Sequence, residues 1–390
     1  MRIKELREQT VRLDGDIANS SVNFAEHTVS VVAVISDVVR GGRPVVGVAF
    51  DSIGRFGQGG ILRERVFPRL MAAEPGELLA ETGDRFDPAA VARIAARNEK
   101  PGGHGDRAAA IAAVELAFWD LNAKLADEPA YRQIAQHFAR PLPSTVDVDV
   151  YAAGGYYVPG EGTARIAEEF RRYQDLGFTA FKMKIGGAPL VEDQARIEAA
   201  LTVAGSGDKL AVDANGRFDI DTALRYAEAI APYQLRWYEE PGDPLDYRLN
   251  RRITAAGALP VATGENLFSI ADVRNLVRHG GMRPGRDIFQ MDAGLSYGLV
   301  EYAEMLTVLE EHGFDRGQAH PHGGHLINLH IVAGLGLGGC EAYPGVFQPF
   351  GGYPAGCLLG AGKVRPTEEP GFGLETKPGL REVLAELRAP

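Results

Sequence analysis

The chain has 390 residues, of which 45% are apolar, 24% charged and 8% aromatic. This composition is typical of a folded globular protein, and the length exceeds the roughly 100 to 200 residues of an ordinary domain. The 41 basic and 52 acidic residues give a net charge of −11, which argues against a basic surface for nucleic-acid phosphates or anionic lipids. We therefore expect two domains, or one large barrel with an addition, and no nucleic-acid or membrane partner.

The first residues and the cysteine count bear on the cellular compartment. The segment 1–10 carries charges where a signal peptide has an apolar stretch, and no window approaches the roughly 18 apolar residues of a transmembrane helix. The chain has only two cysteines, Cys340 and Cys357, which are too few for a disulfide framework. We expect a cytoplasmic protein with two reduced, partly buried thiols.

The N-terminal part combines extended and helical patterns. Three extended runs are predicted at residues 3–13, 27–39 and 43–50. The glycines of Arg40-Gly41-Gly42 suit a hairpin turn between the last two runs, so we expect an antiparallel meander. Helical periodicity follows over residues 60–139, with a broad apolar stripe on the segment 107–125. These patterns predict a small α+β capping domain over residues 1–141.

From residue 146 onward, short β-rich runs alternate with helical stretches. The predicted strands end at Ala152, Lys184, Asp213, Glu239, Glu265, Asp292, His322 and Glu341, and the predicted helices include 163–176, 221–231 and 297–312. Eight such alternations in roughly 200 residues are what a parallel (β/α) barrel of the TIM type requires, with its chemistry where strands end. We predict an α/β fold with a modified barrel over residues 142–360, and a tail over 361–390 that packs back on the first domain.

The spacing of acidic residues predicts a metal site. Asp213, Glu239 and Glu265 follow one another at equal intervals, and Asp292 comes after a nearly equal one, which is one strand-helix unit each time. Neighbouring carboxylates repel and raise one another's pKa unless a cation neutralises them, and oxygen-only ligands select a hard ion such as Mg²⁺. We predict that the first three bind Mg²⁺. The alternative for any single one is a helix-capping or salt-bridging role.

Two lysines precede the acidic series by one unit. Lys182 and Lys184 lie two positions apart at the end of a predicted strand, so both ammonium groups should point toward the same rim. Paired cations beside a metal depress one another's pKa. We therefore expect Lys184 to be a neutral general base, and Lys182 to stay charged and hold a substrate carboxylate. A solvated Lys-x-Lys face is the alternative.

A cluster of histidines offers the opposite catalytic group. Four of the nine histidines lie in the segment 320–330, which raises the possibility of a zinc site. We prefer a different role, because the carboxylates already form a complete hard-metal site and His325 and His330 fall on the following helix. His322 ends the predicted strand after that of Asp292, so the aspartate could orient its imidazole across the site from Lys184. His320 is the competing candidate.

Taken together, the motifs resemble the enolase superfamily, mandelate racemase subgroup, over essentially the whole chain. They are Lys182-Met183-Lys184, Asp213-Ala214-Asn215, Trp237-Tyr238-Glu239-Glu240-Pro241, Gly264-Glu265-Asn266, Gln290-Met291-Asp292 and Pro321-His322-Gly323-Gly324. The resemblance implies a capping domain completed by the C-terminal tail, Mg²⁺ on the three carboxylates, and Asn215 beside them. It also implies Lys184 as base on one face of the substrate and the Asp292/His322 dyad on the other.

Within that subgroup, the segments 319–325 and 339–350 resemble the D-tartrate dehydratases. The short glycine-rich loop 54–60 would restrict the pocket and offer Arg55, which favours a small diacid. Arg55 and Lys100 are our candidates for binding its second carboxylate. Glu341 could instead donate a hydrogen bond to the first carboxylate if it is protonated.

The expected reaction is a dehydration. Proton removal beside a carboxylate gives an enediolate that Mg²⁺ and Lys182 stabilise, and His322 then protonates a departing hydroxyl, which leaves a 2-keto acid such as oxaloacetate from D-tartrate. The alternatives are a dehydratase of another small sugar acid, a racemase or epimerase in which Lys184 and His322 trade one proton, and a metal-dependent hydrolase or catalytically silent barrel. We further expect a small-molecule acid substrate and a homo-oligomer.

Overall fold

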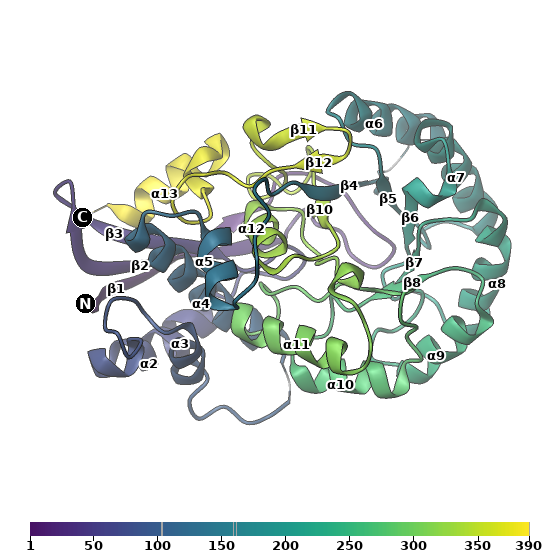
Figure 1. The fold of residues 1–390 in the computed structure, drawn as a ribbon. Helices are drawn as coiled ribbons and strands as arrows, with labels where there is room; N and C mark the ends of the chain where they lie inside the picture. Colours follow the sequence, from purple (N-terminus) through teal and green to yellow (C-terminus); the bar gives the residue numbers. More distant parts are fainter. Residues whose placement is uncertain (103, 159, 161, 390) are drawn as a thin grey trace.

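The protein has two parts, seen at the two ends of the molecule in Figure 1. The structure is a computed structural model that describes residues 1–102, 104–158, 160 and 162–389. A twisted N-terminal sheet with its helices lies at one end, and short parallel strands surrounded by helices lie at the other. The first and last described segments lie together at the end formed by the N-terminal sheet.

The N-terminal sheet is the predicted meander. Its strands are β1 (Ile3–Arg12), β2 (Thr28–Arg40) and β3 (Arg43–Phe50), paired antiparallel in the order β1-β2-β3. Gly41 and Gly42 have φ values of 56° and 78°, so the turn needs two left-handed residues, and Arg40 pairs with Arg43 across it. The prediction of three strands and a glycine hairpin is confirmed.

The helices of this part are centred on α4. They are α1 (Gly59–Ile61), α2 (Phe67–Met71), α3 (Pro88–Ala95), α4 (Gly105–Ala126) and α5 (Ala130–His137). Every residue from 108 to 123 of α4 is buried, so this helix has no solvent-exposed face over that length. The expectation of a single apolar stripe was too narrow, because α4 contacts β2 and β3 and also α11 of the second part.

The second part is a barrel-like arrangement of parallel strands. In chain order these are β4 (Val148–Gly154), β5 (Phe181–Lys184), β6 (Leu210–Asp213), β7 (Tyr238–Glu239), β8 (Val261–Thr263) and β9 (Ile288–Phe289), each paired with the next. Farther along the chain, β10 (Cys340–Ala342) pairs in parallel with β4. The carboxyl ends of these strands therefore face one rim.

The predicted strand ending at His322 is not a regular strand. Only a single bridge joins Phe289 to Ala319, although the backbone N–H groups of His320 and His322 still donate to the segment of β9. Pro321 lies between them and has no N–H to continue a ladder, which explains the interruption. Two neighbouring strands also end early, since Glu265 and Asp292 both lie beyond the last residues of β8 and β9.

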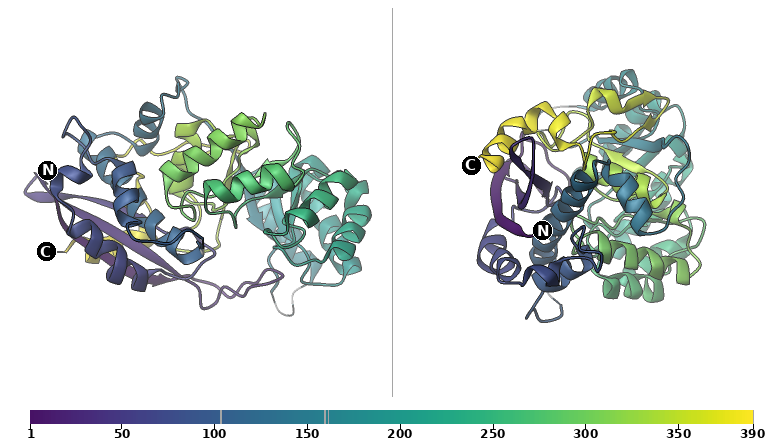
Figure 2. Two further views of the ribbon diagram at one scale, coloured as in Figure 1. Left: turned by 90° about the horizontal axis from the view of Figure 1, so that it is seen from below. Right: turned by 60° about the vertical axis from the view of Figure 1, so that its left-hand side comes forward.

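Helices surround the strands, and the tail returns to the first part. The surrounding helices are α6 (Thr163–Asp175), α7 (Leu190–Ala204), α8 (Ile220–Ile230), α9 (Tyr247–Ala256), α10 (Ile270–His279), α11 (Leu299–Glu311) and α12 (Leu326–Leu335). After them, β11 (Leu358–Gly360) and β12 (Lys363–Val364) extend the sheet beside β4. The last helix, α13 (Arg381–Arg388), packs against β1 and β2 (Figure 2).

Two further expectations bear on the environment of the chain. Cys340 and Cys357 are both buried and free. Within the part of the chain that the structure describes, no helix is both long and apolar enough to cross a membrane. The domain boundaries at 141 and 360 stay a prediction, although the contact of α13 with the N-terminal sheet is the one that we expected of the tail.

Candidate active site

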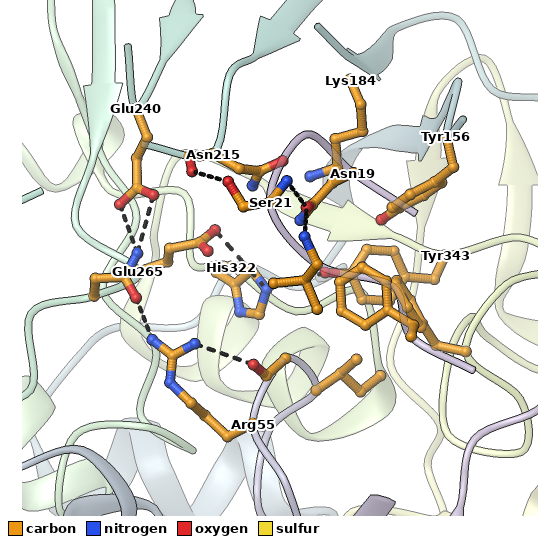
Figure 3. A pocket seen from close by; sticks show the side chains of 16 residues that line it. Asn19, Ser21, Arg55, Tyr156, Lys184, Asn215, Glu240, Glu265, His322 and Tyr343 are labelled. Atoms are coloured by element: carbon orange, nitrogen blue, oxygen red, sulfur yellow. Dashed lines mark hydrogen bonds and ion pairs between the residues drawn. The ribbon is translucent and has the colours of Figure 1, made fainter. Parts of the chain in front are cut away.

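A pocket of about 170 Å³ lies where the N-terminal domain meets the rim of the parallel strands (Figure 3). Two N-terminal segments, within residues 19–24 and 53–55, line it from one side. Residues at or after the strand ends line it from the other, including Lys184, Glu265 and His322. Groups that lie far apart in the sequence therefore face one cavity.

The three predicted metal ligands lie together beneath this pocket. Asp213 ends β6 and Glu239 ends β7, and the two are paired in register, while Glu265 follows β8. Carboxylate oxygens of all three lie within 4.8 Å of one another, and Asp213 and Glu239 are fully buried. The parallel register thus brings three anionic groups to one point, as their regular spacing predicts.

The surroundings of the carboxylates fit a hard divalent cation. Asn215 Nδ2 donates to Asp213 Oδ2 at 3.1 Å, whereas the buried Asn215 Oδ1 has no partner among the described residues. Burial and the nearby Asp213 together raise the pKa of Glu239, even though Lys182 opposes them. A set of oxygen ligands that is unfavourable without positive charge is the chemistry that Mg²⁺ satisfies.

The two lysines reach the carboxylates, which raise the pKa values of both ammonium groups. Lys182 Nζ lies 2.6 Å from Glu239 and 2.7 Å from Glu341, and Lys184 Nζ lies 2.5 Å from Asp213. Burial is the largest single influence on Lys184 and lowers its pKa, but Asp213 together with Tyr156 raises it, and the net shift is upward. The pKa of Lys182 is also raised overall, because Glu239 and Glu341 act with further neighbours against burial. Lys182 does lower the pKa of Lys184, as expected, but the anionic neighbours outweigh this repulsion, so a neutral Lys184 beside a bound metal stays a prediction.

His322 and Asp292 form the predicted pair. His322 Nδ1 lies 3.2 Å from Asp292 Oδ2, and Nε2 lies 3.3 Å from the Tyr343 hydroxyl and 4.0 Å from Glu265 Oε2. Burial lowers the pKa of His322, but Glu265 and the hydrogen bond with Asp292 raise it to about 9. The imidazole is thus held with one nitrogen on the aspartate and the other on the pocket side.

The neighbouring histidines have different surroundings. His320 is buried near the rings of Tyr151 and Trp237, and it is absent from the described residues that line the pocket. His325 caps α12 and His330 lies within it. The only cluster of potential metal ligands found among the described residues is that of the three carboxylates, so the structure gives no support to a zinc site in this segment.

Glu341 lies beside Lys182, but it accepts hydrogen bonds where we expected it to donate one. Its Oε2 accepts hydrogen bonds from the Gly323 N–H and the Tyr343 hydroxyl, each at 2.9 Å, and Lys182 pairs with its other oxygen. Burial is the largest single influence and raises the pKa of Glu341, but Lys182, His322 and Lys184 together lower it overall. A lowered pKa favours the ionised form, so the structure does not support a protonated Glu341 as a donor.

The two candidates for a second carboxylate are separated by the structure. Arg55 lines the pocket, where its guanidinium donates to Asn266 Oδ1 and, at 3.0 Å, to the Gly54 carbonyl. Lys100 is exposed and is not among the described residues that line the pocket. Its backbone carbonyl accepts a hydrogen bond from Arg107 of α4 at 2.9 Å, which holds the segment against that helix. The prediction that Lys100 lies in the site is therefore wrong.

Several lining residues were missed by the sequence analysis. The N-terminal segment docks on the rim through Ser20, whose hydroxyl donates to the Ala214 carbonyl at 2.7 Å. Glu240 is buried and accepts from Asn266 Nδ2 at 2.9 and 3.0 Å (Figure 3). The other lining residues without a predicted role are Asn19, Ser21, Val22, Phe24, Ile53, Tyr156, Tyr343 and Phe347. Glu240 and Asn266 directly follow predicted metal ligands, and this adjacency was a usable signal.

Comparison with known proteins places these features in context. The family of Enolase C-terminal domain-like proteins matches residues 165–380, more than half of the chain. A 3,6-anhydro-alpha-L-galactonate cycloisomerase from Streptomyces coelicolor is 32% identical, over 60% of this chain and 60% of that protein. The match thus spans less than two thirds of the cycloisomerase.

Two dehydratases match over a longer part of the chain. Arabinonate dehydratase from Saccharolobus solfataricus is 27% identical over 70% of this chain and 68% of its own length. L-talarate/galactarate dehydratase from Salmonella typhimurium is 26% identical over 78% of this chain and 71% of its own. Both relatives carry the name of an acid-sugar dehydratase.

Solved structures resemble the whole chain. A racemase from Streptomyces coelicolor with bound magnesium superposes with a TM-score of 0.76 at 23% identity, over 95% of this chain and 96% of that one. L-talarate/galactarate dehydratase from Salmonella typhimurium, liganded with Mg and L-lyxarohydroxamate, gives 0.73 at 21%, over 94% and 88%. At these identities the likeness establishes the fold: an N-terminal domain and a barrel-like domain.

Proposed function

Because the chain belongs to the Enolase C-terminal domain-like family, in its mandelate racemase and muconate lactonizing enzyme branch, we propose that it is a Mg²⁺-dependent dehydratase of small acid sugars. The proposed substrate is D-tartrate, which loses water to give oxaloacetate. The observation that carries the proposal is that Lys184 and His322 line one pocket beside three clustered carboxylates. The dehydratase names of two relatives support the reaction class.

The metal has a defined share in this proposal. Bound Mg²⁺ would neutralise Asp213, Glu239 and Glu265, so that Asp213 no longer favours the protonated form of Lys184, and it would offset the charge that develops on the substrate carboxylate. Lys182 lies 2.6 Å from Glu239, where its ammonium group adds a second positive charge beside the same site. The cation and Lys182 would therefore stabilise negative charge that develops on the substrate during the reaction.

The chain's own residues carry the proton transfers. Lys184 takes the proton from the carbon next to the substrate carboxylate, and the electron pair of that C–H bond forms the new carbon-carbon double bond. The bond from the neighbouring carbon to its hydroxyl breaks, and His322 gives that oxygen a proton so that it leaves as water. The resulting enol then ketonises to the 2-keto acid. Asp292 holds the imidazole through Nδ1, with Nε2 on the pocket side.

The size and charge of the pocket support a small diacid. A cavity of about 170 Å³ lies below the usual volume range of ligand pockets, roughly 300 to 1,000 Å³. Arg55, from the N-terminal domain, provides a guanidinium that lines this cavity, where it can pair with the second carboxylate of the substrate. A C4 hydroxy diacid uses both groups at once.

A library of hydroxy acids and acid sugars, incubated with the protein and Mg²⁺ and assayed for 2-keto acid, tests this proposal. D-tartrate should give oxaloacetate, with L-tartrate and meso-tartrate much poorer, because the α-hydrogen and β-hydroxyl must be presented to Lys184 and His322 on opposite faces. Chelation of the metal should abolish the product. Keto acid from six-carbon sugar acids alone would contradict the assignment of D-tartrate and leave the reaction class intact.

Two other reactions give distinct products in the same library. Inverted substrate without keto acid would indicate the racemase alternative. The anhydro ring of the cycloisomerase relative's substrate carries its oxygen on the carbon beta to the carboxylate, so ring opening without loss of water would instead indicate a cycloisomerase. A homo-oligomeric state and a cytoplasmic location are further parts of the proposal, to be tested by light scattering and by cell fractionation.

A further inference from the structure

A hydroxyl group from the N-terminal domain contacts the Asp292 and His322 pair. Ser52 lies just after β3 and is fully buried. Its hydroxyl donates to Asp292 Oδ2, the same oxygen that lies 3.2 Å from His322 Nδ1, and it also lies 3.2 Å from His325 Nε2. Four side chains from both domains therefore form one continuous hydrogen-bonded chain that ends at the pocket.

The direction of this hydrogen-bonded chain follows from the cap of α12. His325 Nδ1 accepts a hydrogen bond from the backbone N–H of Asn328 at 3.3 Å, so in a neutral imidazole the proton lies on Nε2. Burial lowers the pKa of His325 to about 4, which keeps the ring neutral. Nε2 thus donates to Ser52, and the hydroxyl proton of Ser52 goes to Asp292.

Asp292 is consequently fixed from several directions. Its Oδ1 accepts from the Gly294 N–H at 2.8 Å, and Oδ2 accepts from Ser52 and His322. An ionised carboxylate only accepts, so His322 must present a protonated Nδ1 to it. This leaves Nε2 of His322 on the side of the pocket, next to the Tyr343 hydroxyl.

Two glycines leave room for this hydrogen-bonded chain, Gly294 beside Ser52 and Gly323 beside Asp292 and His325. A Cβ on Gly294 would lie 2.9 Å from the Cβ of Ser52. A Cβ on Gly323, whose φ is 96°, would lie 2.9 Å from both Asp292 Oδ2 and His325 Nε2. The contact of Ser52 with Asp292 therefore requires positions without a side chain, which indicates that the sequence is adapted to it.

We propose that Ser52 and His325 are positioning residues, which orient Asp292 and through it hold the His322 ring with Nε2 toward the substrate. The inference rests on the proposed function, in which His322 protonates the leaving hydroxyl. Without Ser52, Asp292 Oδ2 loses a donor and the carboxylate is held only by the Gly294 N–H and His322, so the proton donor is less precisely placed while Lys184 is untouched.

Ser52→Ala gives the first test. We expect kcat for dehydration to fall roughly 10- to 100-fold, as for a misplaced catalytic group, while KM for the acid changes little and exchange of the α-proton with deuterated solvent continues near the wild-type rate. An equal loss of exchange and dehydration would indicate general damage to the site and would overturn the positioning role.

A matched pair of variants separates the hydrogen-bonded chain from the helix cap. His325→Asn keeps an acceptor for the Asn328 N–H but removes the donor to Ser52, whereas His325→Gln places a donor near the position of Nε2 and loses the cap acceptor. We expect the Asn variant to resemble Ser52→Ala and the Gln variant to retain several times more dehydration. The reverse order would show that only the cap matters and would overturn the proposal.

A measurement on the wild-type protein is independent of the reaction. Nitrogen chemical shifts of histidines labelled with ¹⁵N report which ring nitrogen carries the proton, with assignments taken from the His322 and His325 variants. We expect a neutral His325 protonated on Nε2. A proton on Nδ1 would overturn the inference even if the protein dehydrates D-tartrate, and the expected tautomer would support it even if D-tartrate is not the substrate.

Discussion

The two sides of the pocket are built by different means. On the lysine side, Lys184, Asp213 and Glu239 end three neighbouring parallel strands, and strand register alone places them together. On the histidine side, His322 follows a single β-bridge, and Asp292 lies beyond the end of β9. Hydrogen bonds between side chains, including one from the N-terminal domain, provide the order that a backbone ladder provides on the lysine side.

Because of this difference, substitutions on the two sides of the pocket should have different consequences. On the lysine side, the backbone holds each side chain, so a substitution removes a charge and leaves its neighbours in place. On the histidine side, each group is oriented by the next, so a substitution displaces groups that it does not replace. Variants on the lysine side should therefore remove the first proton transfer, and variants on the histidine side should separate the first step from the second.

The largest effect is expected from Lys184→Ala. Without the base, both exchange of the α-proton and formation of keto acid should fall by roughly 10²- to 10⁴-fold or more, since every later step depends on proton removal. Proton NMR in deuterated solvent measures the exchange, and a coupled assay measures keto acid. Exchange retained at the wild-type rate would place the base elsewhere, with His322 as the first candidate.

His322→Asn should impair dehydration without impairing removal of the α-proton. Dehydration should fall by roughly 10²- to 10⁴-fold, because no acid protonates the leaving oxygen, while exchange of the α-proton by Lys184 persists. The two rates are measured on one sample, so each is the control for the other. Loss of both together would indicate that His322 takes part in binding or in the first proton transfer, and would remove the contrast between the two sides.

A smaller effect is expected from Arg55→Met. Loss of the partner of a desolvated carboxylate costs on the order of 2 to 5 kcal/mol, which should appear mainly as a higher KM for the diacid. A hydroxy acid without a second carboxylate should be much less affected. Lys100→Met is the matched control, because Lys100 is exposed and outside the described pocket lining, and it should leave KM unchanged. A larger effect of Lys100→Met would reverse the assignment.

The last prediction concerns stability instead of turnover, through a buried carboxylate that joins the two domains. Glu115 of α4 accepts from the Leu299 N–H at the start of α11, at 2.8 Å, and burial raises its pKa from an ordinary value of 4.5 to about 7. A carboxyl group whose pKa is higher in the folded protein stabilises it less as the pH rises from about 4.5 to 7, here by on the order of 3 kcal/mol.

Glu115→Gln should remove that loss of stability. Denaturant unfolding at pH 5 and pH 8 measures it as the change in the free energy of unfolding between the two pH values, compared between variant and wild type. Glu311→Gln, an exposed acid at the end of the same α11, is the control and should follow the wild type. An identical pH dependence of the Glu115 variant and the wild type would show that this carboxylate does not bind its proton more tightly in the folded state.

Much of the lysine side was predictable, because the repeat length of a strand-helix unit is a local property. Equal intervals place Asp213, Glu239 and Glu265 at successive strand ends, and parallel pairing brings successive strand ends together. The antiparallel meander and its glycine turn were also predictable, because they follow from short stretches of sequence. The interrupted seventh strand was missed, although Pro321 was visible in the sequence and argues against a regular strand at that point.

The sequence by itself determined the parts whose geometry follows from backbone periodicity: the order of the strands, the carboxylate cluster and the position of Lys184. Only the tertiary structure decided which charges surround Glu341 and that Arg55, not Lys100, lines the pocket. It also decided the contact between Ser52 and Asp292, two residues that lie far apart in the sequence. The physical reason is that each of these depends on groups from different elements meeting in a buried place. There, the balance of charge, burial and hydrogen-bond donors is set by the packing of the two domains and not by any local pattern.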